Sequence, residues 1–292
     1  MNRYKITTIL SITLTFILLS FGVYGCTDKM IKQSVDKPDE VQELADPPVD
    51  ITVMNMGKAD CILIQLQDKA IMIDTGLNKS GSDIVNRLQE KGINKLDLLI
   101  LTHMDKDHIG GADTVIDNIE ISNLIQADYI KENKQYSQYK ESIEDKGITP
   151  VFLHETISTN INGTEINIYP AQKKYYEQSN DYSIIVELKY GRYNFLFAGD
   201  AEEERIKEFL NSNTTKYTFV KIPHHGRYNS MSKKFIKSVS PFYAAITCSE
   251  EEAPDGKLIN ILEKYKIKTY LTSEGEIEVK TDGKAISFNR WI

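Results

Sequence analysis

The stretch that decides the fold is Leu99–Ala112, which reads LILTHMDKDHIGGA. Its apolar start predicts a buried strand that ends at Thr102. A group of metal-ligand side chains then falls within six residues, namely His103, Asp105, Asp107 and His108. Polar side chains just beyond the carboxyl end of a strand collect at one edge of a sheet, where α/β proteins place their sites. Two imidazoles and two carboxylates this close leave uncompensated charge unless a cation joins them, so the stretch predicts a metal site.

Three further strings place polar residues after apolar strands. They are IMIDTG at 71–76 with Asp74, FLFAGD at 195–200 with Asp200, and VKIPHHG at 220–226 with His224 and His225. Four of the five histidines therefore lie in two turns. Taken alone, Asp200 fits an ordinary helix N-cap and Asp74 fits a turn acid that holds backbone amides. The combination with the first stretch favours a shared site.

Strand and helix patterns alternate along the rest of the chain. We expect strands at 51–56, 61–67, 70–74, 96–101, 165–169, 183–190, 193–198, 218–222, 268–271, 276–280 and 285–288. We expect helices at 82–91, 134–145, 202–210 and 256–265. This alternation predicts an α/β layered fold and excludes an all-β sandwich.

The composition excludes several classes of protein. The chain has 292 residues, a net charge of −7, 41% hydrophobic residues and three cysteines. Disordered and disulfide-scaffold proteins are excluded, and so are four-cysteine zinc and iron–sulfur sites. The acidic balance argues against a protein that coats nucleic acid through bulk charge. Cys61 and Cys248 lie in apolar runs and are expected as buried free thiols, with a bridge between them left open.

The amino terminus predicts export. Arg3 and Lys5 precede an uncharged run of 16 residues at 6–21, which is short of the ~30 Å needed to span a bilayer as a helix. The following VYGC at 23–26 resembles a bacterial lipobox, so residues 1–25 are expected as a signal peptide and Cys26 as the lipidated residue. An uncleaved anchor and plain secretion are the alternatives. All three place the chain outside the cytoplasm, and the first anchors it to the cell membrane. Residues 26–48 are then expected as a flexible linker and residues 49–292 as one folded domain.

The motif T-H-x-D-x-D-H-x-G-G at 102–111 resembles the H-x-H-x-D-H motif of the metallo-β-lactamase superfamily, with Asp105 at the second histidine. Together with the D-T-G, G-D-A-E and P-H-H-G strings, it resembles the hydrolase domain of ComEC-type competence proteins. Met54–Cys61, Asn180–Val186 and Thr272–Ile277 are similar to other segments of that domain. The resemblance covers about residues 50–290. It implies a four-layer αββα sandwich of two pseudo-equivalent halves.

The resemblance also implies a two-metal site. One ion would be held by His103, Asp105 and Asn180, and the other by Asp107, His108 and one of the paired histidines. Of that pair we favour His225 as the ligand, which leaves His224 to face the substrate. Asp200 would bridge the ions, and Asp60 and Asp74 would hold ligands and turns in place. The oxygen-rich ligand set fits Zn²⁺ or Mn²⁺.

The expected reaction is phosphodiester hydrolysis by a hydroxide that bridges the metals and is oriented by Asp107. The segment after the histidine pair carries Arg227 and Lys233, and with Lys221, Lys234 and Lys237 it could bind the phosphate backbone of DNA. The resemblance makes Ser230 a phosphate contact. A solvated amphipathic helix is the other interpretation of this lysine run. The alternative functions are another metallohydrolase, such as a phosphocholine esterase or a lactamase-like acyl hydrolase, and a surface binding module without turnover.

Overall fold

Two mixed β-sheets face each other in the computed structural model, which describes residues 37–291. The first sheet has eight strands, in the order β17 (Ile286–Trp291), β16 (Glu276–Thr281), β1 (Val49–Val53), β2 (Ile62–Leu66), β3 (Lys69–Ile73), β5 (Leu98–Leu101), β7 (Leu124–Ala127) and β8 (Val151–Leu153). The second has seven, in the order β15 (Lys268–Leu271), β14 (Tyr243–Ile246), β13 (Phe219–Lys221), β12 (Tyr193–Phe197), β11 (Ile185–Tyr190), β10 (Thr164–Tyr169) and β9 (Ile157–Ile161). A short pair, β4 (Lys95–Leu96) and β6 (Glu120–Ile121), lies apart from both.

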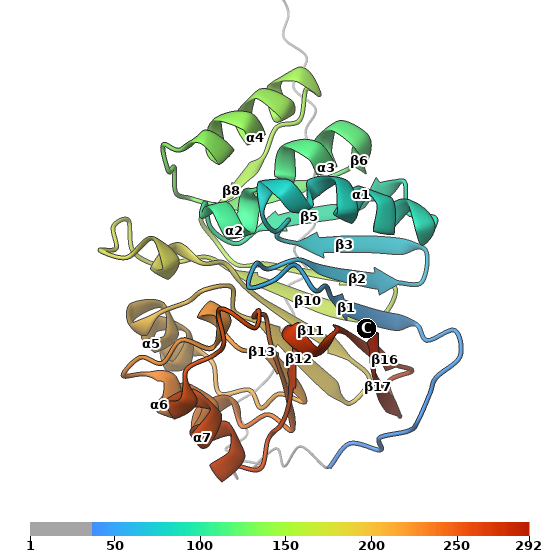
Figure 1. Ribbon diagram of the computed structural model, residues 1–292, viewed down its shortest axis with the longest axis vertical. Helices are drawn as coiled ribbons and strands as arrows, with labels where there is room; N and C mark the ends of the chain where they lie inside the picture. Colours follow the sequence, from blue (N-terminus) through green and yellow to red (C-terminus); the bar gives the residue numbers. More distant parts are fainter. Residues whose placement is uncertain (1–36, 292) are drawn as a thin grey trace, which may run out of the picture. The chain divides into compact units, whose positions relative to one another are not determined.

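Helices cover the outer face of each sheet (Figure 1). The first sheet is covered by α1 (Gly81–Glu90), α2 (Lys106–Ile109), α3 (Ala112–Asn118) and α4 (Lys134–Asp145). The second is covered by α5 (Glu203–Ser212), α6 (Ser232–Val239) and α7 (Gly256–Lys264). The four-layer αββα sandwich expected from the sequence is confirmed.

The alternation of side chains along the strands builds the layers. In β12, Phe195 and Phe197 belong to the core between the sheets, whereas Leu196 belongs to the core under the helices. Successive side chains of a strand point to opposite faces, so one strand feeds both cores. In α6, Phe235, Ile236 and Val239 are buried, and helical spacing leaves the lysines between them on the solvent face.

Parallel pairing brings several strand ends to the same edge. β3 pairs with β5 in parallel, and β12, β13 and β14 are also parallel to one another. The turns after β3, β5, β12 and β13 lie at the carboxyl ends of these strands and carry the sequence motifs identified above.

Some expected elements differ in the structure. The strand expected at 96–101 is divided at Asp97, whose carboxylate accepts hydrogen bonds from Lys69 Nζ and Ala70 N. β7 and β14 were not predicted individually, whereas α6 is the amphipathic helix that was one of two interpretations of the lysine run. Cys61 and Cys248 are buried free thiols, so they do not form the bridge that was left open.

The amino-terminal predictions fall largely outside the described residues. The signal peptide and Cys26 lie before residue 37, so they stay predictions. From Asp39 onward the expected linker contacts the domain: Ile286 N donates to Asp39 O, and Val41 N donates to Ile286 O. Within residues 37–291, none of the helices has the length and apolarity needed to cross a membrane.

Candidate metal centre

The first turn of the site follows β5 and depends on close backbone packing. The amides of His108 and Ile109 donate to Asp105 O and start α2, which carries Asp107 and His108. A Cβ at Gly110 would lie 2.4 Å from both Asn78 N and Lys106 O. Only glycine fits there, which explains the Gly-Gly that closes the motif.

The second turn follows β13 and has an unusual backbone. His224, His225 and Gly226 have φ angles of 49°, 50° and 76°. Left-handed conformations cost free energy for residues other than glycine and concentrate at functional sites. The turn directs the two neighbouring imidazoles to different places. The His225 ring is buried, while the His224 side chain is 28% exposed.

Ring nitrogens and carboxylate oxygens from both halves converge at the sheet edge. His108 Nε2 and His225 Nε2 lie 3.2 and 3.1 Å from Asp200 Oδ2. His225 Nε2 also lies 3.6 Å from Asp107 Oδ2. The His103 and His108 rings are 4.0 Å apart between centroids. The donor atoms form two overlapping groups within 4.8 Å, one of His103, His108 and Asp200 and the other of Asp107, His108 and His225.

Among residues 37–291, the donor atoms at the centre of this cluster have no hydrogen-bond partner. They are the Nε2 atoms of His103, His108 and His225, and Asp200 Oδ1. Buried polar atoms without partners are costly, and three imidazole nitrogens with a carboxylate are a ligand set typical of Zn²⁺ and other divalent metals. The residues present therefore fit a divalent cation.

Neighbouring groups fix the orientation of the histidines. Asp74 accepts hydrogen bonds from Thr102 N and Thr102 Oγ1, at 2.8 and 2.7 Å, and its Oδ2 lies 2.7 Å from His108 Nδ1. On the other side, His225 Nδ1 lies 3.0 Å from Thr247 Oγ1, which donates to Asp60 Oδ1 at 2.6 Å. Hydrogen bonding at Nδ1 leaves Nε2 as the ligand atom of each ring.

Burial and charge shift the pKa values of the cluster in opposite directions. Burial lowers the pKa of His103 to about 3, so this ring is neutral and its lone pair is available. Burial also acts to lower the pKa of His108, but Asp200 and Asp74 raise it well above its usual value. The pKa of His225 is likewise raised by Asp200 and Asp107 against the effect of burial. The carboxylates therefore attract positive charge to this point.

Asp105, Asn180 and His224 lie in the wall of the pocket over the cluster. Asp105 Oδ1 pairs with Lys131 Nζ at 2.6 Å. The Asn180 side-chain amide donates to Glu202 Oε1 at 2.9 Å, and the same oxygen lies 3.0 Å from His224 Nδ1. The pocket has a volume of about 390 Å³. It exposes Asp107, Asp200 and His225 at its base.

Four cationic side chains line this pocket, namely Lys58, Lys106, Lys131 and Arg227. Lys58 Nζ lies 3.6 Å from Asp107 Oδ2 and 3.2 Å from Glu252 Oε1. Of the four, only Arg227 was singled out in the sequence. Lys106 lies inside the Leu99–Ala112 stretch and Lys58 inside Met54–Cys61, but neither was predicted to line the site, and no local signal marks Lys131.

The other predicted substrate contacts lie elsewhere. Ser230 and Lys233 are exposed and do not line the pocket, and Ser230 N donates to Glu203 Oε1 at 3.0 Å. The lysine run forms the solvated face of α6 instead. Lys221 was grouped with the surface cations but is fully buried: its ammonium pairs with Asp60 and lies 3.8 Å from Asp200 Oδ1. Every second side chain of a strand points to the same face, so Lys221 lies on the inward face of β13 together with Phe219.

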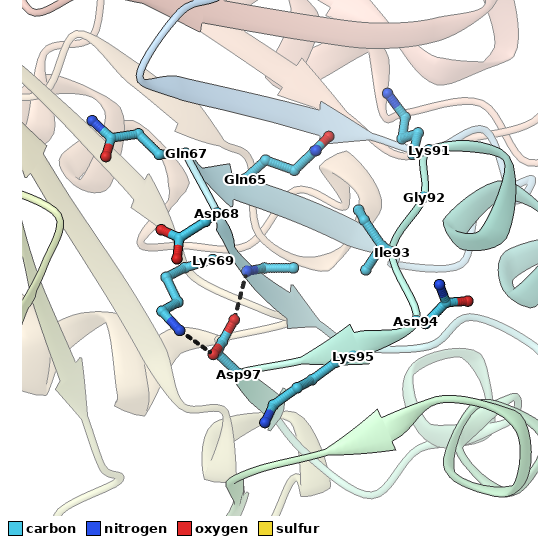
Figure 2. Close-up of a pocket in the computed structure, with 11 residues that line it drawn as sticks. Gln65, Gln67, Asp68, Lys69, Lys91, Gly92, Ile93, Asn94, Lys95 and Asp97 are labelled. Carbon is cyan, nitrogen blue, oxygen red and sulfur yellow. Dashed lines mark hydrogen bonds and ion pairs between the residues drawn. The ribbon is translucent and has the colours of Figure 1, made fainter.

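A larger pocket, of about 460 Å³, lies at the opposite ends of β3 and β5 (Figure 2). Figure 2 shows Lys69 and the Ala70 amide both bonded to Asp97, at 3.1 and 3.0 Å. The Asp97 carboxylate is therefore already satisfied, and none of the described residues that line this pocket is a histidine. The pocket with unpartnered ligand atoms is the better candidate site.

Comparisons with known proteins agree with this geometry. A sequence profile of the metallo-β-lactamase superfamily matches residues 55–246. ComE operon protein 3 of Bacillus subtilis is 23% identical over 264 residues, which cover 82% of this chain and 34% of that protein. Recombination protein 2 of Haemophilus influenzae is 24% identical over 250 residues, which cover 82% of this chain and 29% of that protein. The chain thus spans about a third of the length of these relatives.

A solved structure supports the fold. The metallo-β-lactamase fold protein YhfI from Bacillus subtilis superimposes with a TM-score of 0.53 at 12% identity, covering 84% of this chain and all of that one.

Proposed function

Because the chain belongs to the metallo-β-lactamase superfamily, and is a metallohydrolase-fold protein related to competence proteins, we propose that it is a metal-dependent phosphodiesterase acting on DNA. Divalent cations would supply a nucleophilic water at neutral pH and neutralise charge in the transition state. The proposed site holds two divalent ions, and Zn²⁺ and Mn²⁺ are the candidate metals.

The observation that supports a phosphodiester is the ring of cations around the cluster. Four lysine and arginine side chains line one pocket, in a chain whose net charge is −7. Three of the pocket carboxylates, those of Asp105, Asp107 and Asp200, are proposed metal ligands. Metal would neutralise them and leave the wall positively charged. A positively charged pocket in an acidic protein concentrates anionic substrates.

The residues of the pocket wall would have different roles. Lys58 and Lys131 lie beside Asp107 and Asp105, so they can contact phosphate oxygens over the metal centre. The Glu202 carboxylate accepts from His224 Nδ1, and this hydrogen bond lowers the pKa of Glu202. This hydrogen bond orients the His224 ring toward the pocket, where its Nε2 lies 3.3 Å from Asn180 Nδ2 and can contact the substrate.

The place of action is also part of the proposal. The export signal expected at 1–25 and the lipid anchor expected at Cys26 would hold the hydrolase outside the cytoplasm, at the cell membrane. The DNA substrate would then be extracellular or entering DNA.

Hydrolysis of bis-(p-nitrophenyl) phosphate by the full chain, with Mn²⁺ or Zn²⁺, tests the proposal. We expect turnover that Asp107→Ala or His108→Ala abolishes and that Asp117→Ala, at an exposed carboxylate on α3, leaves unchanged. p-Nitrophenyl phosphorylcholine and nitrocefin test the alternative hydrolases. The proposal fails if neither bis-(p-nitrophenyl) phosphate nor single-stranded DNA is cleaved with either metal.

A further inference from the structure

The loop of residues 171–179, called the aromatic arm here, presents an unusually exposed tyrosine. Tyr175 is 75% exposed, the highest value among the large apolar side chains that are exposed in residues 37–291. Figure 1 shows this loop, between β10 and β11, projecting on the same side as α2 and the end of β3. Burying an aromatic ring is favourable, so a ring held in water at the rim of a site is a candidate contact for a ligand.

The arm is held rigidly by the neighbouring tyrosine. Tyr176 is 3% exposed, and its hydroxyl accepts from the amides of Gln172 and Lys173, both at 2.9 Å. The same hydroxyl donates to Glu208 at 2.7 Å, and Tyr176 N donates to Tyr182 Oη at 3.0 Å. Because Tyr176 is fixed inward, Tyr175 stands on an ordered base and is directed outward. A pre-ordered platform loses little conformational entropy on binding.

The arm joins the wall of the metal pocket directly. Ser179, at the end of the arm, accepts a 3.3 Å hydrogen bond from Lys131 Nζ, the ammonium that pairs with Asp105. Ser179 is four positions after Tyr175 in the chain, which is at most about 14 Å of extended backbone. Tyr182, just beyond the arm, stacks on Tyr129 with ring centroids 4.1 Å apart.

The stacked pair also adjoins the pocket lysine, because Tyr129 lies two residues before Lys131 in the chain. Ile130, which is 59% exposed, adds apolar surface between Tyr129 and Lys131.

Cationic groups accompany the arm on its other side. A second hollow, of about 230 Å³, is lined by Lys173, Lys174 and His154. Lys173 pairs with Glu204, whereas Lys174 has no carboxylate partner within the part of the chain that the structure describes. Exposed aromatic rings interleaved with cations are the pattern by which proteins bind unpaired nucleic acid strands.

We propose that the aromatic arm is a stacking platform on which Tyr175 binds an unpaired base of single-stranded DNA while Lys131 and Lys174 contact its phosphates. The inference rests on the proposed phosphodiesterase function and gives that site its substrate class. A strand bound this way extends from the metal pocket across the arm. Paired bases in a duplex do not offer their faces to Tyr175.

Fluorescence anisotropy with a short labelled oligothymidylate tests the proposal without requiring turnover. Tyr175→Ala should raise the dissociation constant at least about fivefold, in line with measured base–aromatic stacking, and Tyr175→Trp should restore tight binding. Tyr265→Ala, at an exposed tyrosine after α7, is the matched control and should leave binding unchanged. The same variants should bind a duplex of equal length alike.

The outcomes separate the two proposals. Hydrolysis of bis-(p-nitrophenyl) phosphate should be equal in the native chain and Tyr175→Ala, because that diester is too small to reach the arm. Equal oligothymidylate binding by the native chain and Tyr175→Ala overturns the platform, whatever the hydrolysis. Failure of the native chain to cleave both the small diester and single-stranded DNA overturns the proposed function, even where Tyr175→Ala weakens binding.

Discussion

A buried lysine beside the metal-ligand cluster offsets part of the negative charge of its carboxylates. Lys221 is fully buried between Asp60 and Asp200, at the end of β13. Its ammonium offsets part of the negative charge that the carboxylates bring to the interior. A buried ion pair contributes little net stability, but removing one partner leaves the other charge uncompensated.

Replacing Lys221 should therefore be far more damaging than replacing a surface lysine. We expect Lys221→Met to lower the free energy of unfolding by about 3 kcal/mol or more. Lys233→Met, on the exposed face of α6, should change it by less than about 0.5 kcal/mol. Urea unfolding followed by circular dichroism measures both. Equal effects of the two substitutions would mean that Lys221 is not the buried ion-pair partner described here.

Asp50 on β1 offers a pH test of burial. Burial, and then the neighbouring Glu278, raise its pKa to about 6, and its Oδ1 has no hydrogen-bond partner. A raised carboxyl pKa favours folding when the group is protonated, so this stabilisation is lost as pH rises from about 4 to about 6.

Asp50→Asn should therefore stabilise the protein at pH 7 by about 1–2 kcal/mol and have little effect at pH 4. Unfolding midpoints at the two pH values measure the difference. Asp117→Asn, at an exposed carboxylate, serves as the control. A stabilisation of equal size at both pH values would show that the charge of Asp50 is not its cause.

At the level of secondary structure, the functional side chains are positioned by turns and not by regular helices or strands. The P-H-H-G turn holds three successive residues at positive φ, so it can aim His225 into the cluster and His224 into the pocket. A Cβ at Gly226 would lie 2.6 Å from Pro254 Cβ. The turn therefore requires glycine for its backbone and for its packing.

Gly226→Ala should destabilise the protein by at least about 1–2 kcal/mol and weaken metal binding, because the turn must move. Gly256→Ala is the matched control. A Cβ at Gly256 meets no atom within 4 Å, so that change should be neutral or slightly stabilising. Thermal unfolding and metal titration measure both effects. If the two variants bind metal equally well, the turn does not position His225.

Element by element, the sequence predicts local features and misses pairings between distant segments. The expected helix at 134–145 is α4 with the same bounds, because its amphipathic pattern is local. The lysine run within residues 226–237 was ambiguous, since its charges suggest a substrate surface and its spacing suggests a helix. The structure shows that its second half belongs to α6. Lys131 and Lys58 could not be identified, because their partners are set by tertiary packing alone.

In the candidate site too, the sequence predicts the local motifs and misses the contacts between distant segments. The histidine and aspartate motifs identify the strand ends that meet, and the structure brings His103, Asp107, His108, Asp200 and His225 together. Asp60 accepts a hydrogen bond from Thr247, 187 residues away, and no local pattern reveals this contact. That Asp105 and Asn180 also bind metal stays a prediction.

For the molecule as a whole, the site depends on both sheets. His103 and His108 follow β5 of the first sheet, whereas Asp200 and His225 follow β12 and β13 of the second. Divalent cations would therefore cross-link the two halves. A ligand that binds only the folded state stabilises it by about 2.7 kcal/mol at a hundred times its dissociation constant.

Metal binding should weaken as the pH falls. The pKa values of His108 and His225 are raised, so protons occupy these rings at a higher pH than usual and compete with metal. We expect the metal affinity to drop about tenfold per pH unit for each proton displaced. Calorimetric titration with Mn²⁺ from pH 8 to pH 6 measures it. A pH-independent affinity would contradict the assignment of these rings as ligands.

The most direct test of the central claim, a metal centre built by both halves, is the metal content of the purified chain after dialysis against Zn²⁺ or Mn²⁺. The account predicts about two ions per chain, their loss in His108→Ala and Asp200→Ala, and full retention in His154→Ala, whose imidazole is exposed. A native chain that retains no metal, or a His108→Ala chain that retains as much as the native one, would contradict it.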